Sequence, residues 1–103
     1  LSISLDDAVN KIREYGGIAV PAHINKPSYS ILSQLGFLPP DLGLTLLEFS
    51  HNYPIDFSAF PNCRFINSSD AHYLGQILER KTTIPVEELT ISGVYHYLYQ
   101  CFI

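Results

Sequence analysis

The stretch from Arg64 to His72 ends in residue types that bind metal ions. Arg64 to Asn67 has the character of a short strand, and Asp70 and His72 follow it closely. Strand side chains alternate between two faces, so Asp70 and His72 would project to the same side if the extended conformation continued. A carboxylate beside an imidazole makes a compact site suited to zinc, manganese or iron. The alternative is that Asp70 caps a turn and His72 is a surface residue.

A second apolar run ends in the same way. Residues 18–22 are predicted to form a buried strand, which opens after two glycines and ends at His23. In parallel α/β folds the carboxyl ends of neighbouring strands meet at one edge, and ligands bind there. The sequence therefore predicts that His23 lies at the same edge as Asp70 and His72.

The two segments, GGIAVPAHI (16–24) and NSSDAHYL (67–74), together resemble the last two motifs of the PHP (polymerase and histidinol phosphatase) domain family. The resemblance covers residues 5–74, and more weakly the residues that follow. It implies an α/β fold, namely the C-terminal part of a distorted (β/α)7 barrel of the TIM type. Residues 1–103 would then be a single fragment that lacks the N-terminal metal-binding half. The resemblance implies that His23, Asp70 and His72 are metal ligands.

The same resemblance implies a metal-dependent phosphoesterase, a hydrolase of phosphomonoesters or phosphodiesters. The complete domain would hold two or three divalent ions, zinc, manganese or iron, and would act on a phosphorylated small molecule or a nucleotide. The fragment alone is expected to be inactive, because the remaining ligands would lie elsewhere in the barrel. Two alternatives remain open: a non-catalytic α/β interaction module, and a PHP accessory domain of a DNA polymerase.

Three further polar residues lie near the predicted strand ends. Lys26 follows His23 and would contact a phosphate oxygen, or would be a solvated loop lysine. Glu48 and His51 lie at the end of the predicted strand 44–49. They would orient the metal ligands by hydrogen bonds or serve a structural purpose.

The composition limits the classes of partner. The net charge of −4 argues against a basic nucleic-acid interface, and two cysteines predict no disulfide framework. No membrane span or signal peptide is evident, and free thiols are expected in the reducing cytoplasm. The chain contains no methionine and begins with leucine, so we expect a piece of a longer protein. The apolar share of 47% predicts apolar surface that faces the rest of the barrel or another copy of the chain.

Apolar periodicity and capping residues predict the elements that position these side chains. Ser4 is expected to cap the first helix with Asp7, Ser28 the second and Thr90 the last. Pro85 limits the final β-branched run to an edge strand. The predicted helices are 5–15, 28–35 and 91–101; the predicted strands are 18–22, 44–49 and 64–68, all parallel, with an edge strand at 82–86.

Overall fold

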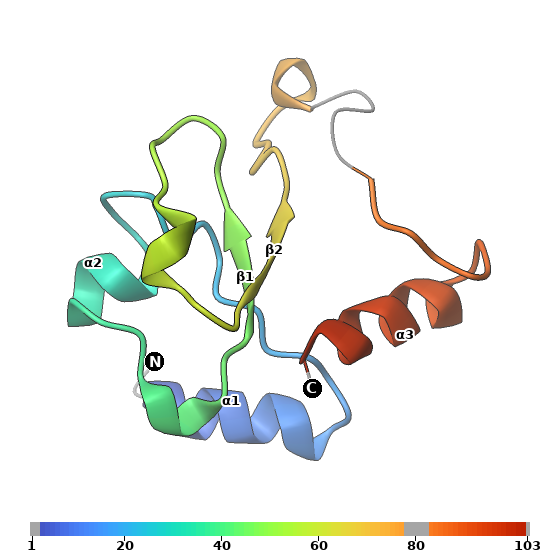
Figure 1. The fold of residues 1–103 in the computed structure, drawn as a ribbon, viewed down its shortest axis with the longest axis horizontal. Coiled ribbons are helices and arrows are strands. Elements are labelled where there is room, and N and C mark those ends of the chain that lie inside the picture. Colours follow the sequence, from blue (N-terminus) through green and yellow to red (C-terminus); the bar gives the residue numbers. More distant parts are fainter. Residues whose placement is uncertain (1–2, 78–82, 103) are drawn as a thin grey trace.

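The chain forms a small α/β protein. The computed structural model describes residues 3–77 and 83–102, and in these ranges it contains two parallel strands and three α-helices (Figure 1). Strand β1 (Leu46–Phe49) pairs with β2 (Arg64–Asn67) in parallel, with Leu46 opposite Arg64 and Phe49 opposite Asn67. The predicted strands 44–49 and 64–68 are therefore confirmed, apart from their terminal residues. Their parallel direction is also confirmed.

Helix α1 (Leu5–Glu14) begins where the sequence predicts and ends one residue earlier than predicted. The Ser4 hydroxyl accepts the Asp7 N–H at 3.1 Å, which satisfies one of the free donors of the first turn. At the other end Gly16 adopts a φ of 77°, a left-handed conformation that favours glycine. The Arg13 guanidinium donates to the carbonyls of Leu42 and Gly43 and so joins α1 to the chain that leads into β1.

Helix α2 (Ile31–Leu35) is shorter than predicted, and its cap is Ser30 rather than Ser28. Ser30 and Ser33 form a reciprocal capping box, in which each side chain accepts the other residue's backbone N–H. Tyr29 has a φ of 56°, so the backbone before Ser30 cannot be helical. The prediction for residues 28–30 was wrong because it took the first of two serines as the cap.

The predicted strand 18–22 is not a regular strand, although it lies where a third strand would. Glu48 donates its N–H to the Pro21 carbonyl at 3.0 Å and accepts the Ile24 N–H at 2.9 Å. In a parallel ladder both bonds of one residue go to the same neighbour, so this segment borders β1 on the edge away from β2. Pro21 has no N–H to donate, and His23 has a φ of 28°; these two features interrupt the ladder.

Helix α3 (Ile91–Phe102) is capped by Thr90, as predicted, whose hydroxyl accepts the Gly93 N–H at 2.9 Å. The Tyr95 hydroxyl donates to the Gly16 carbonyl at 2.7 Å and connects α3 to the end of α1. The predicted edge strand 82–86 was wrong for residues 83–86, which form no strand; Thr82 lies outside the described residues. Pro85 removes one of the donors that such a strand would need.

The core lies between α1 and the start of β1. Val9, Ala19, Leu42 and Leu44 form its cluster of buried residues. Leu46 and Leu47 are completely buried although they are adjacent in β1, because both faces of this strand are covered. Each such leucine contributes about 1.5–3 kcal/mol relative to an exposed position. In the described ranges, no helix has the length and apolar character needed to span a bilayer.

The connector between β1 and β2 packs its aromatic side chains against the ring of Phe65 in β2. A 3₁₀ turn at Phe57–Ala59 brings Phe57 to 4.8 Å from Phe65, measured between ring centroids, in an edge-to-face arrangement. Phe60 contacts the same ring at 6.0 Å. Rings in this geometry attract each other beyond the area they bury. The connector therefore packs against β2 through the ring of Phe65.

Candidate functional site

Asp70 is at the centre of a charged cluster just beyond the carboxyl end of β2. Its Oδ2 lies 3.6 Å from Lys26 Nζ, and its Oδ1 lies 3.6 Å from His72 Nε2. The side chains of Lys26 and Asp70 are 24% and 35% exposed, whereas that of His72 is 77% exposed. Partly buried charges with both partners in place favour a defined carboxylate position. In its described contacts the Asp70 carboxylate pairs with Lys26 and His72 instead of capping a turn.

The proximity of Asp70 and His72 is confirmed, but the predicted reason for it was wrong. The extended conformation ends at Asn67, and Asp70 adopts a left-handed φ of 49°. A bent loop, rather than strand alternation, therefore directs both side chains to one place. The His72 N–H donates to the side-chain oxygen of Gln76 at 2.8 Å, which fixes the far end of this loop.

Glu48 connects the three segments that end at this edge. Its Oε1 accepts the His23 backbone N–H at 3.0 Å, and its Oε2 accepts the Ser68 hydroxyl at 2.5 Å. Hydrogen bonds to an ionised carboxylate are about twice as strong as neutral ones. Glu48 therefore holds the turn after residue 22 and the loop after β2 at a fixed separation.

His23 is half-buried and adopts a φ of 28°, which is unusual for any residue other than glycine. Its ring Nδ1 is shielded from solvent and has no hydrogen-bond partner among the described residues. Strained backbone and unsatisfied polar atoms both concentrate at functional sites. Two of the three predicted ligands, His23 and Asp70, therefore have a left-handed backbone conformation, and both lie at the same edge of the sheet.

The predicted site residues come together in part. Asp70, His72 and Lys26 form one cluster, and Glu48 joins the backbone of His23 to the Ser68 loop. Within residues 3–77 and 83–102, no three His, Cys, Asp or Glu side chains form a group that could hold a metal ion.

His51 and Asn25 complete the description of this edge. His51 lies exposed on the turn after β1. Asn25, which the sequence analysis did not single out, accepts the Ser50 N–H at 2.8 Å and donates to the carbonyls of Ser50 and Tyr53 at 2.6 and 3.0 Å. The sequence around Asn25 gives no sign of these bonds, because Ser50 and Tyr53 lie 25 and 28 positions further along the chain.

Lys26 is not a freely solvated loop lysine. Its backbone N–H donates to the His23 carbonyl at 2.9 Å, which closes a turn at the end of the irregular strand. The same turn directs its ammonium group toward the Asp70 carboxylate. A partly exposed pair of this kind contributes at most about 1 kcal/mol to stability, so its position matters more than its energy.

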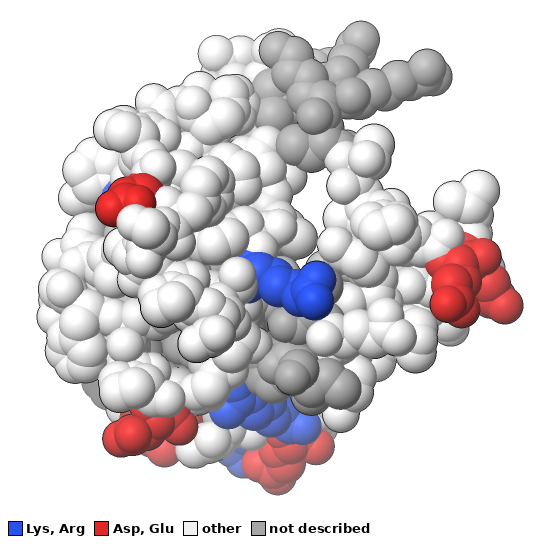
Figure 2. Space-filling view, viewed as in Figure 1, with Lys and Arg blue, Asp and Glu red and all other residues white. Residues whose placement is uncertain are grey.

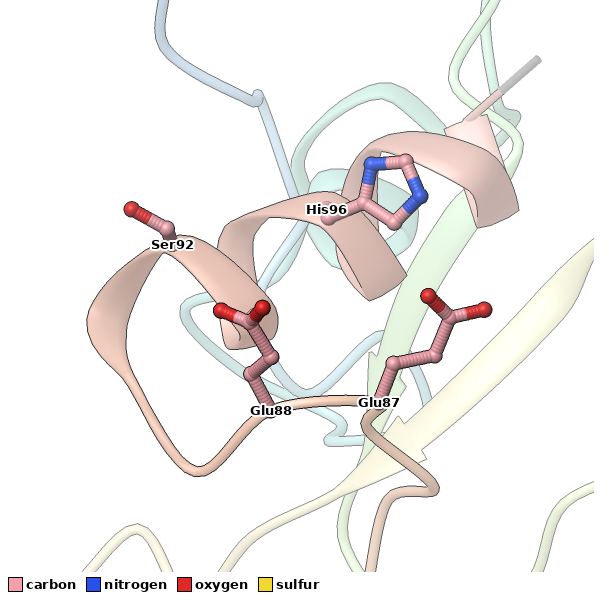
Figure 3. A pocket seen from close by; sticks show the side chains of 5 residues that line it. Glu87, Glu88, Ser92 and His96 are labelled. Atoms are coloured by element: carbon pink, nitrogen blue, oxygen red, sulfur yellow. The ribbon is translucent and has the colours of Figure 1, made fainter.

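A second polar hollow, of about 300 Å³, lies at the start of α3 (Figure 3). Glu87 and Glu88 from the preceding loop and Ser92 and His96 from α3 line it, together with Gly93. His96 is exposed, and its Nε2 lies 3.0 Å from the side-chain nitrogen of Gln100. These acidic groups belong to the exposed start of a helix, and the strand edge remains the stronger candidate site.

Charged side chains elsewhere are scattered. Figure 2 shows one face of the molecule, on which a basic area near the centre lies among uncharged residues and the basic side chains at the lower edge adjoin acidic ones. This agrees with the net charge of −4. A phosphate group would therefore depend on local contacts rather than on a basic surface.

The fold and this edge define a small α/β protein with a polar cluster at the carboxyl ends of two parallel strands. No family model, curated protein or solved structure matches the chain. Function is therefore inferred from the site itself.

Proposed function

We propose that this chain carries part of the active site of a metal-dependent phosphoesterase of the PHP type. The observation that supports it best is the Asp70 carboxylate, which has His72 at one oxygen and Lys26 at the other. An acidic oxygen, an imidazole and an ammonium group at one strand edge are the groups that metal-assisted phosphate chemistry uses. The complete barrel would supply the other ligands, and its substrate would be a phosphorylated small molecule or a nucleotide.

The residues fit a divalent ion in two respects. Bond lengths of about 2.0–2.2 Å separate two ligands of a tetrahedral ion by roughly 3.3–3.5 Å. Asp70 Oδ1 and His72 Nε2 are 3.6 Å apart, close to that separation. The buried Nδ1 of His23 has no protein partner in the described chain, but it forms no three-ligand group with Asp70 and His72 there, so it would serve a different ion of the complete site. Bound zinc, manganese or iron would polarise the phosphoryl group and lower the pKa of a coordinated water.

The residues of this chain would bind and orient the ester. Lys26 has three N–H donors, so its contact with Asp70 leaves others for a phosphate oxygen. Glu48 would keep His23 and the Asp70 loop at a constant separation, because it accepts hydrogen bonds from both segments. Since only Asp70 and His72 lie together among the described ligand residues, we expect weak metal binding and little hydrolysis by the chain alone.

The test is the substitution Asp70→Asn in the intact protein that carries this chain. Asparagine tolerates the left-handed backbone, so the fold should persist while the negative charge is lost. Bound metal should fall, and turnover of a phosphomonoester or phosphodiester should fall by about 100-fold or more. Asp41→Asn, at an exposed carboxylate of a 3₁₀ turn, is the matched control. Equal metal content and turnover in wild type and Asp70→Asn would contradict the proposal.

The second candidate is a non-catalytic α/β interaction module. It is favoured by α3, whose twelve residues include no Asp, Glu, Lys or Arg, and whose described apolar side chains are exposed at Ile91, Val94, Tyr95 and Tyr99. Ile91 is 91% exposed and Leu89, just before the helix, is 97% exposed. Under this alternative the contacts of Asp70 are structural, and Asp70→Asn would leave metal content unchanged.

A further inference from the structure

Helix α3 turns an apolar side toward solvent. Four apolar residues recur at intervals of three and four positions and therefore share one side of the helix: Ile91, Val94, Tyr95 and Leu98. An amphipathic surface helix normally packs this side against its own core. Here Ile91 is 91% exposed, and Val94 and Tyr95 are 39% and 44% exposed. The apolar side of α3 is therefore largely uncovered in the described chain.

Neighbouring residues enlarge this apolar area. Leu89, two residues before the helix, is 97% exposed and borders an open groove that runs beside Ile91. The Tyr95 ring stacks on that of Tyr99, with centroids 6.0 Å apart, and Tyr99 is 45% exposed. Together these side chains form the α3 face, which consists of Leu89, Ile91, Val94, Tyr95, Leu98 and Tyr99.

The beginning of α3 is accessible to another molecule. The helix contacts β1, and the Tyr95 hydroxyl donates to the Gly16 carbonyl at 2.7 Å. Figure 1 shows that the first turns of α3 project away from the sheet. A partner can therefore cover Leu89 and Ile91 while the core stays intact.

The charges favour a second copy of the chain as this partner. Residues 89–102 contain no Asp, Glu, Lys or Arg, whereas the chain as a whole has a net charge of −4. Two copies therefore meet with the least electrostatic repulsion where this uncharged surface covers itself. An exposed apolar area on an otherwise polar surface is typical of protein–protein contacts.

The available area is sufficient for a dimer. Aromatic side chains bury about 150–250 Å² each and aliphatic ones somewhat less, so the exposed fractions of the α3 face amount to roughly 600 Å² per chain. Two copies would then bury about 1,200 Å², which is at the lower limit of stable interfaces. We therefore expect a reversible dimer, in which monomers with an open α3 face persist at low protein concentration.

We propose that two copies of the chain associate through the α3 face, with their α3 helices antiparallel about a two-fold axis near Val94. This register places Ile91 against the partner's Leu98, and the two-fold axis repeats the contact. Antiparallel helices oppose their dipoles, and they keep Glu87 and Glu88 of the two copies at opposite ends of the interface. The inference is independent of the phosphoesterase proposal.

Sedimentation velocity of the full chain at increasing concentration tests the association. We expect a monomer–dimer equilibrium with a dissociation constant on the order of 10 μM. Ile91→Lys should weaken it by at least about 100-fold, because a two-fold interface would bury the new charge twice. Leu74→Lys is the matched control, since Leu74 is 86% exposed but lies outside the α3 face. Both variants should keep the wild-type circular dichroism spectrum, because both side chains are exposed.

Oxidative cross-linking tests the antiparallel arrangement. On a Cys63→Ser, Cys101→Ser background, Val94→Cys should form an intermolecular disulfide, because position 94 lies close to the proposed axis. Ile91→Cys should not, since the two copies of position 91 would be about 10 Å apart along the helices, too far for a disulfide.

Each result supports or overturns the proposal. A wild-type chain that remains monomeric at every concentration would overturn it and leave the α3 face to a different protein. A dimer that Ile91→Lys does not weaken would place the interface elsewhere on the chain. Equal cross-linking of Val94→Cys and Ile91→Cys would overturn the antiparallel arrangement. None of these measurements involves metal or phosphate, so failure here would leave the phosphoesterase proposal standing.

Discussion

The backbone N–H of His23 donates to Glu48 Oε1 at 3.0 Å, although the two residues are 25 positions apart. Glu48 belongs to β1, and its other oxygen accepts the Ser68 hydroxyl of the loop after β2. One carboxylate therefore joins the end of β1 to the loop after β2 and to the irregular segment that borders β1. The half-buried Glu48 carboxylate therefore connects the turn that carries His23 to the loop that carries Asp70.

Replacing Glu48 with alanine should destabilise the protein. The substitution removes both bonds and leaves the His23 N–H without its acceptor, which costs about 1–3 kcal/mol of unfolding free energy. Urea denaturation followed by circular dichroism measures this change. Glu14→Ala is the control, because Glu14 is exposed and its ion-pair partner within residues 3–77 and 83–102 is the exposed Lys11, at 3.5 Å; its effect should stay below about 0.5 kcal/mol. Equal unfolding free energies for the two variants would contradict this account of Glu48.

The helix ends were predictable because their signals are local. Ser4 and Thr90 cap α1 and α3 as expected, since a cap needs only a side-chain oxygen and an N–H within the first turn. The start of α2 was not predictable in this way. Ser28 and Ser30 are equally good capping residues, and the left-handed conformation of Tyr29 that decides between them has no signature in the sequence.

The strand edge was predictable only in outline. The apolar run of β1 and the residue types of Asp70 and His72 indicated a polar edge beside a parallel pair. The interruption at Pro21 and His23 was missed, although proline in a strand is a warning. The contacts of Lys26 with Asp70 and of Glu48 with Ser68 depend on how separate segments come together. Such long-range contacts cannot be derived from spacing along the chain.

The Cys63 thiol should react slowly at neutral pH. Burial raises its pKa above the ordinary value, because the thiolate loses hydration; the sulfur lies 3.9 Å from the Leu44 carbonyl. Alkylation by iodoacetamide, measured against pH in Cys101→Ser, should therefore reach half its maximal rate at a higher pH than in the same variant unfolded in urea. An equal or lower midpoint in the folded protein would show that burial does not control this thiol.

The same shift predicts a loss of stability at alkaline pH. Because the folded pKa is the higher one, Cys63 contributes stability below the unfolded pKa, and this contribution disappears as the pH rises through the folded pKa. Unfolding free energy measured across this range should fall less in Cys63→Ser on the Cys101→Ser background. Parallel pH profiles for the two proteins would contradict the prediction.

The apolar face of α3 should bind a hydrophobic dye. A groove of about 610 Å³ is lined by Leu89, Ile91, Val94 and their neighbours, and two of these side chains are almost fully exposed. Exposed apolar patches of this kind bind anilinonaphthalene sulfonate. The fluorescence should fall in Ile91→Lys and stay constant in Leu74→Lys, since Leu74 is 86% exposed but lies outside the groove. An equal decrease in both variants would place the dye elsewhere.

Asn25 should contribute more to stability than its loop position suggests. Its side chain makes three hydrogen bonds to the backbone of Ser50 and Tyr53, and Ser50 is only 5% exposed. Asn25→Ala would leave the buried Ser50 N–H and carbonyl without these partners, at a cost of about 2–3 kcal/mol in unfolding free energy.

Asn10→Ala is the matched control for this loss, because Asn10 lies on the exposed face of α1. Alanine favours a helix more than asparagine does, so this variant should change the unfolding free energy by no more than about 0.7 kcal/mol, and in the stabilising direction. Urea denaturation midpoints with equal slopes would show that both variants unfold from comparable native states. If Asn25→Ala and wild type have the same urea denaturation midpoint, the bonds to Ser50 and Tyr53 do not stabilise the packing of the end of β1 on the Lys26 turn.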